Sequence, residues 1–143
     1  MLGIIFSIIA GISMSLQGVF NTRLGEKIGL WETCIIVQGS ALLLTIIISL
    51  FAGKGNYKNI YSANKIYLLG GVLGVIITYT VMKGIGLLGP TYSIGTILVA
   101  QLLAAGIIDS FGLFGAEQVK FHFTKYIGIL TMVVGIILFK WKG

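Results

Sequence analysis

Polar side chains recur at helical spacing inside long apolar stretches of this chain. Ser13, Gln17 and Asn21 follow one another every four residues, so a helix would carry all three on one face. Gln101 and Asp109, eight residues apart, would share a face in the same way. Polar groups in lipid cost free energy unless they find partners, so these stripes indicate either buried contacts or a hydrated cavity.

Amide side chains offer both donors and acceptors, which suits them to bind a polar substrate. One interpretation is that the stripes converge on a substrate cavity. The other is that the amides hydrogen-bond across helices as structural contacts, each contributing roughly 0.6–2 kcal/mol. We favour the cavity because hydrogen-bonding the amides of several stripes to one another would leave some of their N–H donors without acceptors. The predicted substrate-binding residues are Ser13, Gln17, Asn21, Gln38, Tyr79 and Gln101.

Charged side chains near the ends of the apolar stretches suggest electrostatic roles. No acidic residue lies in the middle of a stretch, and Asp109 is the nearest candidate for coupling protons to transport, since packing inward would raise its proton affinity. A residue in that position more often caps a loop or pairs with a lysine. Arg23 and Lys83 would attract an anionic substrate, although reaching to the lipid headgroups is their default.

The same residues give little support to an enzyme, a metal site or nucleic-acid binding. His122, the single histidine, has no neighbouring serine, cysteine or aspartate, so no catalytic residues, metal ligands or cofactors are predicted. The single cysteine, Cys34, is expected to be a small packing residue. The net charge of +6 comes from Lys and Arg at the ends of apolar stretches, which indicates contact with headgroups rather than with nucleic acid.

Composition predicts that these side chains lie on membrane-spanning helices. Apolar residues make up 57% of the 143 residues, and the mean hydropathy is +1.03. Stretches of roughly 20 mainly apolar residues are long enough to cross the hydrocarbon core. We therefore predict an all-α integral membrane protein with a single transmembrane domain over residues 1–143. Its five or so spans are expected at residues 2–20, 32–52, 66–88, 91–108 and 125–139.

Backbone-shaping residues predict how the helices begin and meet. Pro90 stands where a new helix would start, because its missing N–H is tolerated in a first turn. Small residues four apart would let helix backbones approach closely, either within one subunit or between two. Such pairs are Gly11 with Ser15, Gly70 with Gly74, and Ala100 with Ala104.

Lys and Arg are divided equally between the two sides of the predicted membrane. With equal numbers of Lys and Arg on the two sides, charge does not set one orientation during membrane insertion. Copies would therefore insert in both orientations and pair as antiparallel homodimers. The alternative is that Lys83 lies too deep to count, which would fix one orientation. On one side are Lys54, Lys58, Lys65, Lys120 and Lys125, and on the other are Arg23, Lys27, Lys83, Lys140 and Lys142.

Two other functional hypotheses stay open beside a transporter that works by alternating access. A polar stripe alone does not distinguish alternating access from a passive dimeric channel for a small ion or solute. A structural membrane subunit that transports nothing is the third hypothesis. Saturable flux with counterflow would support the carrier.

The chain resembles the YdcZ-type branch of the drug/metabolite transporter superfamily. The most specific motifs are Gln-Gly-xx-Asn-xx-Leu, at residues 17–24, and the run at residues 101–115 that contains Asp109. The similarity includes residues 68–81 and 126–140, and Ala100 stands where the family usually has Gly. The first-helix acid of the small multidrug-resistance exporters is missing, which argues against exchange of a cation for protons.

The resemblance implies a drug/metabolite-transporter-like bundle of about five helices in the bacterial inner membrane. It further implies an exporter of small molecules, made as an antiparallel dimer or as paired or fused copies in opposite orientations. Gln17, Asn21, Gln101 and Asp109 stand at matching motif positions. The expected partners are a second copy, membrane lipid and a small neutral or anionic organic substrate.

Overall fold

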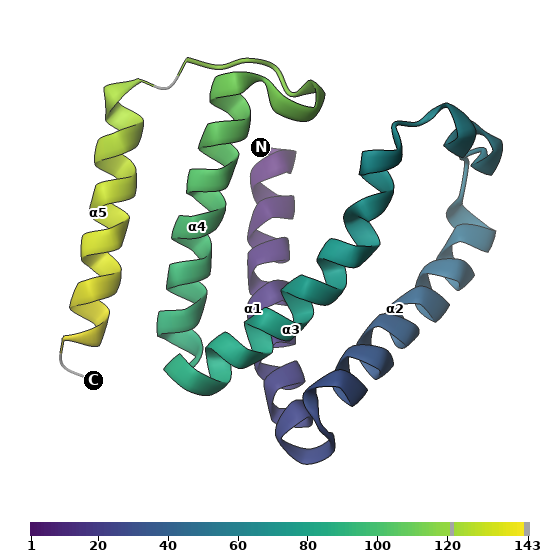
Figure 1. Cartoon of the computed structure of the whole chain (residues 1–143), viewed down its shortest axis with the longest axis horizontal. Coiled ribbons are helices and arrows are strands. Elements are labelled where there is room, and N and C mark those ends of the chain that lie inside the picture. Colours follow the sequence, from purple (N-terminus) through teal and green to yellow (C-terminus); the bar gives the residue numbers. More distant parts are fainter. Residues whose placement is uncertain (121, 142–143) are drawn as a thin grey trace. The chain divides into compact units, whose positions relative to one another are not determined.

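The computed structural model describes residues 1–120 and 122–141, and the regular structure in these residues is helical. Five helices are long and apolar enough to cross a membrane, which confirms the predicted number (Figure 1). The third candidate span counts from Lys65, because short 3-10 turns lead into α3. The elements are α1 (Leu2–Ile28), α2 (Leu30–Ala52), η1 (Tyr57–Ser62), η2 (Lys65–Leu69), α3 (Gly70–Leu88), α4 (Pro90–Phe111), η3 (Leu113–Gly115) and α5 (Phe123–Lys140).

Single glycines make the two tight connections between helices. Gly29 joins α1 to α2 with φ 102°, and Gly89 joins α3 to α4 with φ 78°, a backbone region that favours glycine. Pro90 follows at the start of α4, as the sequence predicts. The helix extends beyond the span predicted at residues 2–20, however. Residues 21–28 continue α1, because Gly29 alone is enough to reverse the chain.

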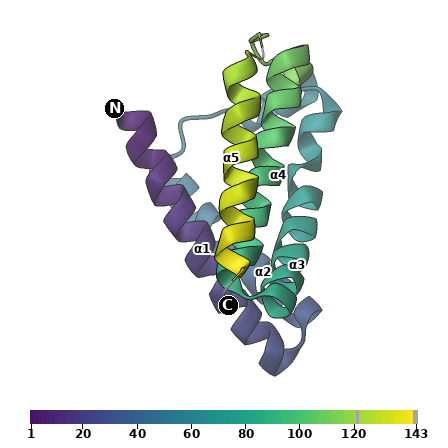
Figure 2. The ribbon, with the colours of Figure 1, turned by 90° about the vertical axis from the view of Figure 1, so that its left-hand side faces the viewer.

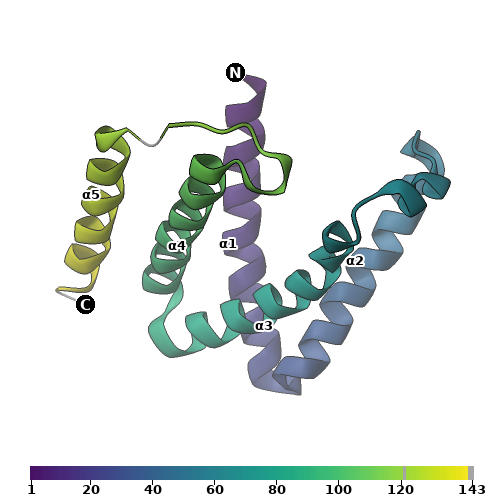
Figure 3. The same ribbon diagram turned by 45° about the horizontal axis from the view of Figure 1, so that its top comes forward.

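The chain divides into two compact units, unit 1 (Met1–Leu87) and unit 2 (Leu88–Gly143). In unit 1 the three helices meet near the Gly29 turn, whereas the N-terminal half of α1 diverges from α2 and α3 (Figures 1 and 3). The buried residues of unit 1 accordingly lie near that turn. They are Gly18, Asn21, Thr22 and Gly25 of α1, Thr33 and Cys34 of α2, and Met82 and Ile85 of α3.

The closest packing in unit 1 occurs at Gly18 and Gly25, which the small-residue spacing did not select. A Cβ placed on Gly18 would lie 2.8 Å from Cδ1 of Ile85, and one on Gly25 would lie 3.5 Å from Sδ of Met82. By contrast, a Cβ on Gly11 or Gly70 would meet nothing within 4 Å in the described structure. A Cβ on Gly74, four residues after Gly70, would however lie 3.4 Å from Nε2 of Gln38. Among the described residues, packing within one subunit is therefore absent at Gly11 and present at one member of the Gly70–Gly74 pair, and contact between two subunits stays a prediction.

Unit 2 is an antiparallel pair of helices, α4 and α5, which lie side by side in both views (Figures 1 and 2). Near the Gly89 end, a Cβ on Gly95 would lie 3.0 Å from Cγ1 of Ile136. In the same region the Lys140 ammonium lies 4.8 Å from the centre of the Tyr92 ring, a cation–π distance. The contact of small and aromatic side chains closes this end of the pair.

The segment after α4 turns back onto the end of that helix. Gly112, at φ 60°, ends the helix in a left-handed conformation. The Val119 amide then donates to the Asp109 carbonyl at 2.9 Å, and Nε2 of Gln118 donates to the Ser110 carbonyl at 2.9 Å. These bonds satisfy carbonyls that the helix leaves without partners.

Candidate substrate site

Asn21 is the predicted binding residue whose setting is most unusual for an amide. It lies between Gly18 and Gly25 on the face of α1 that contacts the rest of unit 1, and its side chain is 8% exposed. No hydrogen bond to its amide group occurs among the residues that the structure describes. The amide atoms themselves keep some accessible surface, because no fully enclosed side-chain nitrogen or oxygen among the described residues lacks a partner, so a ligand or a water molecule can reach and bond this amide.

The other buried polar groups of α1 and α2 have partners. The Thr22 hydroxyl donates to the Gly18 carbonyl at 2.7 Å, and the Thr33 hydroxyl donates to the Gly29 carbonyl at 2.8 Å. Both bonds lie within the residue's own helix turn, which is a common way to satisfy a hydroxyl in a membrane helix. Asn21 is buried like Thr22 and Thr33, but it differs from them because its side chain has no hydrogen-bond partner among the described residues.

Gln17 and Ser13 continue the Asn21 stripe along α1 but are exposed. The reason is the geometry of unit 1: α1 diverges from α2 and α3 toward its N-terminus, so only the end of the stripe near Gly29 is covered. Sequence spacing correctly places these residues on one face of α1. It does not show how much of that face a neighbouring helix covers.

Gln38 and Tyr79 connect α2 to α3. Nε2 of Gln38 donates to the Thr78 hydroxyl at 3.3 Å, and the Tyr79 ring stacks on Trp31 with centroids 4.6 Å apart and an interplanar angle of 20°. Both side chains are partly buried. The bond of Gln38 to Thr78 is a contact between helices, which is the structural alternative to substrate binding given in the sequence analysis. The sequence did not predict the pairing of Tyr79 with Trp31.

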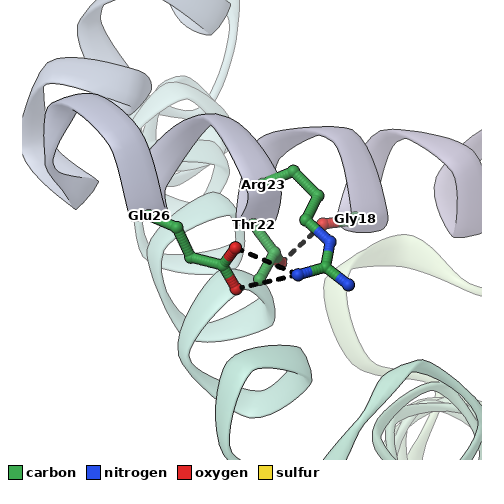
Figure 4. A network of polar contacts seen from close by, with 4 residues as sticks. All are labelled: Gly18, Thr22, Arg23 and Glu26. Carbon is green, nitrogen blue, oxygen red and sulfur yellow. Dashed lines mark hydrogen bonds and ion pairs between the residues drawn. The ribbon is translucent and has the colours of Figure 1, made fainter.

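The two candidate electrostatic residues of unit 1 lie on its surface. Nη1 of Arg23 forms an ion pair with Oε2 of Glu26 at 3.1 Å, and the two side chains are 75% and 52% exposed (Figure 4). Glu26 therefore screens the charge that would attract an anion. Lys83 is exposed on α3.

In unit 2, Asp109 lines a groove between α4 and α5, whereas Gln101 is exposed and does not line it. The groove has a volume of about 590 Å³. It also contains Lys125 and Thr131 of α5, neither of which sequence reasoning placed in a site. A loop separates Lys125, near the start of α5, from Asp109, near the end of α4. The two residues line the same groove because the helices pair antiparallel.

Asn21 belongs to unit 1 and Gln101 to unit 2, so a common cavity that joins them stays a prediction. Among the described residues, no three histidine, cysteine, aspartate or glutamate side chains gather where they could hold a metal ion. Among the described residues, the protein has a buried asparagine without a hydrogen-bond partner near the Gly29 turn and a charged groove between α4 and α5.

Comparison with known families identifies the class of protein. Residues 2–138 match the family model described as "Putative inner membrane exporter, YdcZ". No curated protein and no solved structure matches the chain. The family match covers four candidate spans in full and the fifth except for its last two residues, and it agrees with the resemblance drawn from the motifs at residues 17–24 and 101–115. The chain therefore belongs to the YdcZ family and is an integral transport protein of the inner membrane.

Proposed function

We propose that two copies of this chain form an exporter that moves a small neutral or anionic organic molecule across the inner membrane by alternating access. The proposal depends first on Asn21, a buried residue whose amide group has no hydrogen-bond partner among the described residues and is not fully enclosed. An amide in this state gains a hydrogen bond when a polar solute reaches it, and a neutral side chain does not require a solute of fixed charge. Asn21 is therefore the central binding residue of the proposed site.

The other predicted residues take supporting roles in this site. Gln17 and Ser13 extend the polar face of α1 away from Asn21, along the path that a solute would follow. Gln101 supplies a second amide from α4. Gln38 and Tyr79 hold α2 against α3, and Lys83 lies where it would raise the local concentration of an anion. Asp109 is the candidate for proton coupling.

Two observations support an antiparallel arrangement of the two copies, namely the charge balance and the packing of unit 1. With the predicted spans, the ten Lys and Arg residues would be divided equally between the two sides, so charge would favour neither orientation if Lys83 counts with the rest. Within unit 1 the helices are packed at the Gly29 end and diverge at the other. A second, inverted copy would place its packed end beside the divergent end of the first, which gives the two-fold inverted symmetry common in transporters.

Orientation is tested with a reporter fused to the C-terminus. Lys58→Gln removes a positive charge from one side and Lys140→Gln removes one from the other, so the two variants should shift the orientation of the reporter in opposite directions. The unaltered chain should show both orientations. A single orientation that neither substitution changes would contradict dual topology and leave a parallel or monomeric transporter.

Substrate binding is tested by a thermal-shift screen of the purified protein against a metabolite library. The screen is repeated with Asn21→Ala, and with Thr22→Val as the matched control, because the Thr22 hydroxyl is already bonded to Gly18. Compounds that stabilise the protein and the Thr22→Val variant but not Asn21→Ala would support the site. Hits that bind Asn21→Ala just as well would place the site elsewhere.

Counterflow in proteoliposomes then separates a carrier from a passive channel. A carrier loaded with unlabelled substrate should take up labelled substrate against its concentration gradient and should saturate. A channel should show faster flux without exchange. If compounds bind and none is transported, the structural-subunit hypothesis gains support instead.

A further inference from the structure

The groove between α4 and α5 is charged at one end and mainly apolar along the rest of its length, where Thr131 is the polar lining residue. Asp109 lies near the end of α4 and Lys125 near the start of α5. Because the two helices are antiparallel, both charges fall at the same end of the groove. Farther along, the walls are formed by apolar and small side chains, namely Leu102, Ala105, Gly128 and Met132.

Each charged residue stands at the unfavourable end of its own helix dipole. A helix carries partial negative charge at its C-terminus, where Asp109 lies, and partial positive charge at its N-terminus, where Lys125 lies. The half-buried Asp109 carboxylate makes no ion pair or hydrogen bond with the residues that the structure describes. It would therefore gain from a cationic group supplied from outside the chain.

Small residues make room for a ligand beside that carboxylate. A Cβ built on Gly128 would meet nothing within 4 Å, so the floor of the groove is open there. The groove volume of about 590 Å³ is within the range of roughly 300–1,000 Å³ that small-molecule sites occupy. From Leu102 to Asp109 the helix rises by roughly 10 Å, enough for a headgroup and the first part of a lipid chain.

We propose that this groove binds a phospholipid whose headgroup ends in a primary ammonium, such as phosphatidylethanolamine. The ammonium donates to the Asp109 carboxylate, the phosphate lies at Lys125, and an acyl chain follows Leu102 and Met132. A primary ammonium has three N–H donors for a carboxylate, whereas a choline headgroup has none. The neighbouring ammonium and phosphate of the headgroup are opposite in charge to Asp109 and Lys125, which lie together at one end of the groove. The apolar walls match an acyl chain better than a water-soluble solute.

This inference is separate from the proposed transport function, because Asn21 and the solute it would bind play no part in it. It also gives Asp109 a role other than proton coupling. A headgroup ammonium bonded to the carboxylate would hold this side chain at the membrane interface.

Native mass spectrometry of the delipidated protein tests the proposal. The protein is incubated in detergent with an equimolar mixture of isotopically labelled phosphatidylethanolamine, phosphatidylglycerol and phosphatidylcholine. The ethanolamine lipid should be retained preferentially, and Asp109→Asn should lower its retention about tenfold, to the level of the choline lipid. Glu117→Gln, which removes an acidic residue of the following loop that does not line the groove, should leave retention unchanged.

A second pair of variants tests the groove without altering charge. Gly128→Leu should fill the floor of the groove and reduce lipid retention, whereas Gly135→Leu should not, although a Cβ at either glycine meets nothing within 4 Å. Glycerophosphoethanolamine, the headgroup without acyl chains, should fail to displace the lipid. Equal retention of the three lipids, unchanged retention in both groove variants, or displacement by the free headgroup would each overturn the proposal.

Discussion

Units 1 and 2 use polar side chains in different ways, although the sequence marks both with the same helical stripes. In unit 1 most of the partly or fully buried polar groups are bonded within the protein, as in the contact of Gln38 with Thr78 and the internal bonds of Thr22 and Thr33. Asn21 is the exception. In unit 2 the charged groups of Asp109 and Lys125 line an open groove, beside Thr131, whose hydroxyl donates to the Ile127 carbonyl at 2.9 Å.

The difference shows that helical spacing identifies a polar face but not its use. A third helix covers the polar groups of unit 1 near Gly29, so an amide there must find a partner or pay for desolvation. Unit 2 has two helices, and the small residues between them leave space that a ligand can enter. The hydrogen-bonded polar residues of unit 1 should therefore affect stability, whereas Asn21 and the polar residues that line the groove of unit 2 should affect binding.

The largest effect is expected from filling the close approach in unit 1. Gly18→Leu would force a side chain against Ile85 and Val81, which lie 2.8 and 3.2 Å from a Cβ at that position. Overpacking of this kind costs about 1–3 kcal/mol. Thermal unfolding of the purified protein in detergent should show a clear loss of stability. Gly11→Leu is the control, because nothing lies within 4 Å of its Cβ. Equal losses in both variants would contradict the described packing of α1.

The next largest effect separates the two units directly. A double-mutant cycle on Gln38→Leu and Thr78→Val should give a coupling energy of roughly 0.6–2 kcal/mol, the range for hydrogen bonds between membrane helices. Asp109→Asn, the comparable neutral change in unit 2, should alter stability by less than about 0.5 kcal/mol in lipid-free detergent. Reversible unfolding in a denaturing detergent measures all of these variants. A stability loss for Asp109→Asn as large as the coupling energy would remove the distinction between the units.

Stacking between α2 and α3 should contribute a smaller amount. Trp31 and Tyr79 lie 4.6 Å apart at their centroids, and such aromatic pairs are worth about 0.5–1.5 kcal/mol beyond their area. Tyr79→Leu should therefore reduce stability by about that amount and change the fluorescence of Trp31, while Tyr79→Phe should retain both. If Tyr79→Phe behaves like Tyr79→Leu, the hydroxyl and not the ring is important, as it would be for a residue that binds substrate.

Sequence reasoning could predict the parts of this molecule that depend on local patterns. The number of spans, the start of α4 at Pro90, the burial of Cys34 and the family follow from hydropathy and motifs. The packing glycines could not be predicted, because small-xxx-small spacing is as regular at Gly11, which meets nothing, as at a helix contact. Which amide is buried depends on where α1 diverges from its neighbours.

The groove shows the same limit for a site. Asp109 stands out in the sequence as an acid near a span end, but Lys125 becomes part of the same groove only when α5 turns back along α4. Long-range pairing of this kind leaves no periodic signal in the sequence.

The smallest effect is expected from the ion pair on the surface of unit 1. Arg23 and Glu26 are 3.1 Å apart on one helix face, but both side chains are mainly exposed, and exposed pairs typically contribute about 0.2–1 kcal/mol. Arg23→Gln should therefore change thermal stability little, and the remaining effect should decrease as salt is added, since exposed charges are screened. If Arg23 instead attracts an anionic substrate, Arg23→Gln would weaken substrate binding at low salt with no loss of stability, and Glu26→Gln would strengthen it. That pair of results would move Arg23 from the structural residues of unit 1 to its binding residues and reduce the contrast with unit 2.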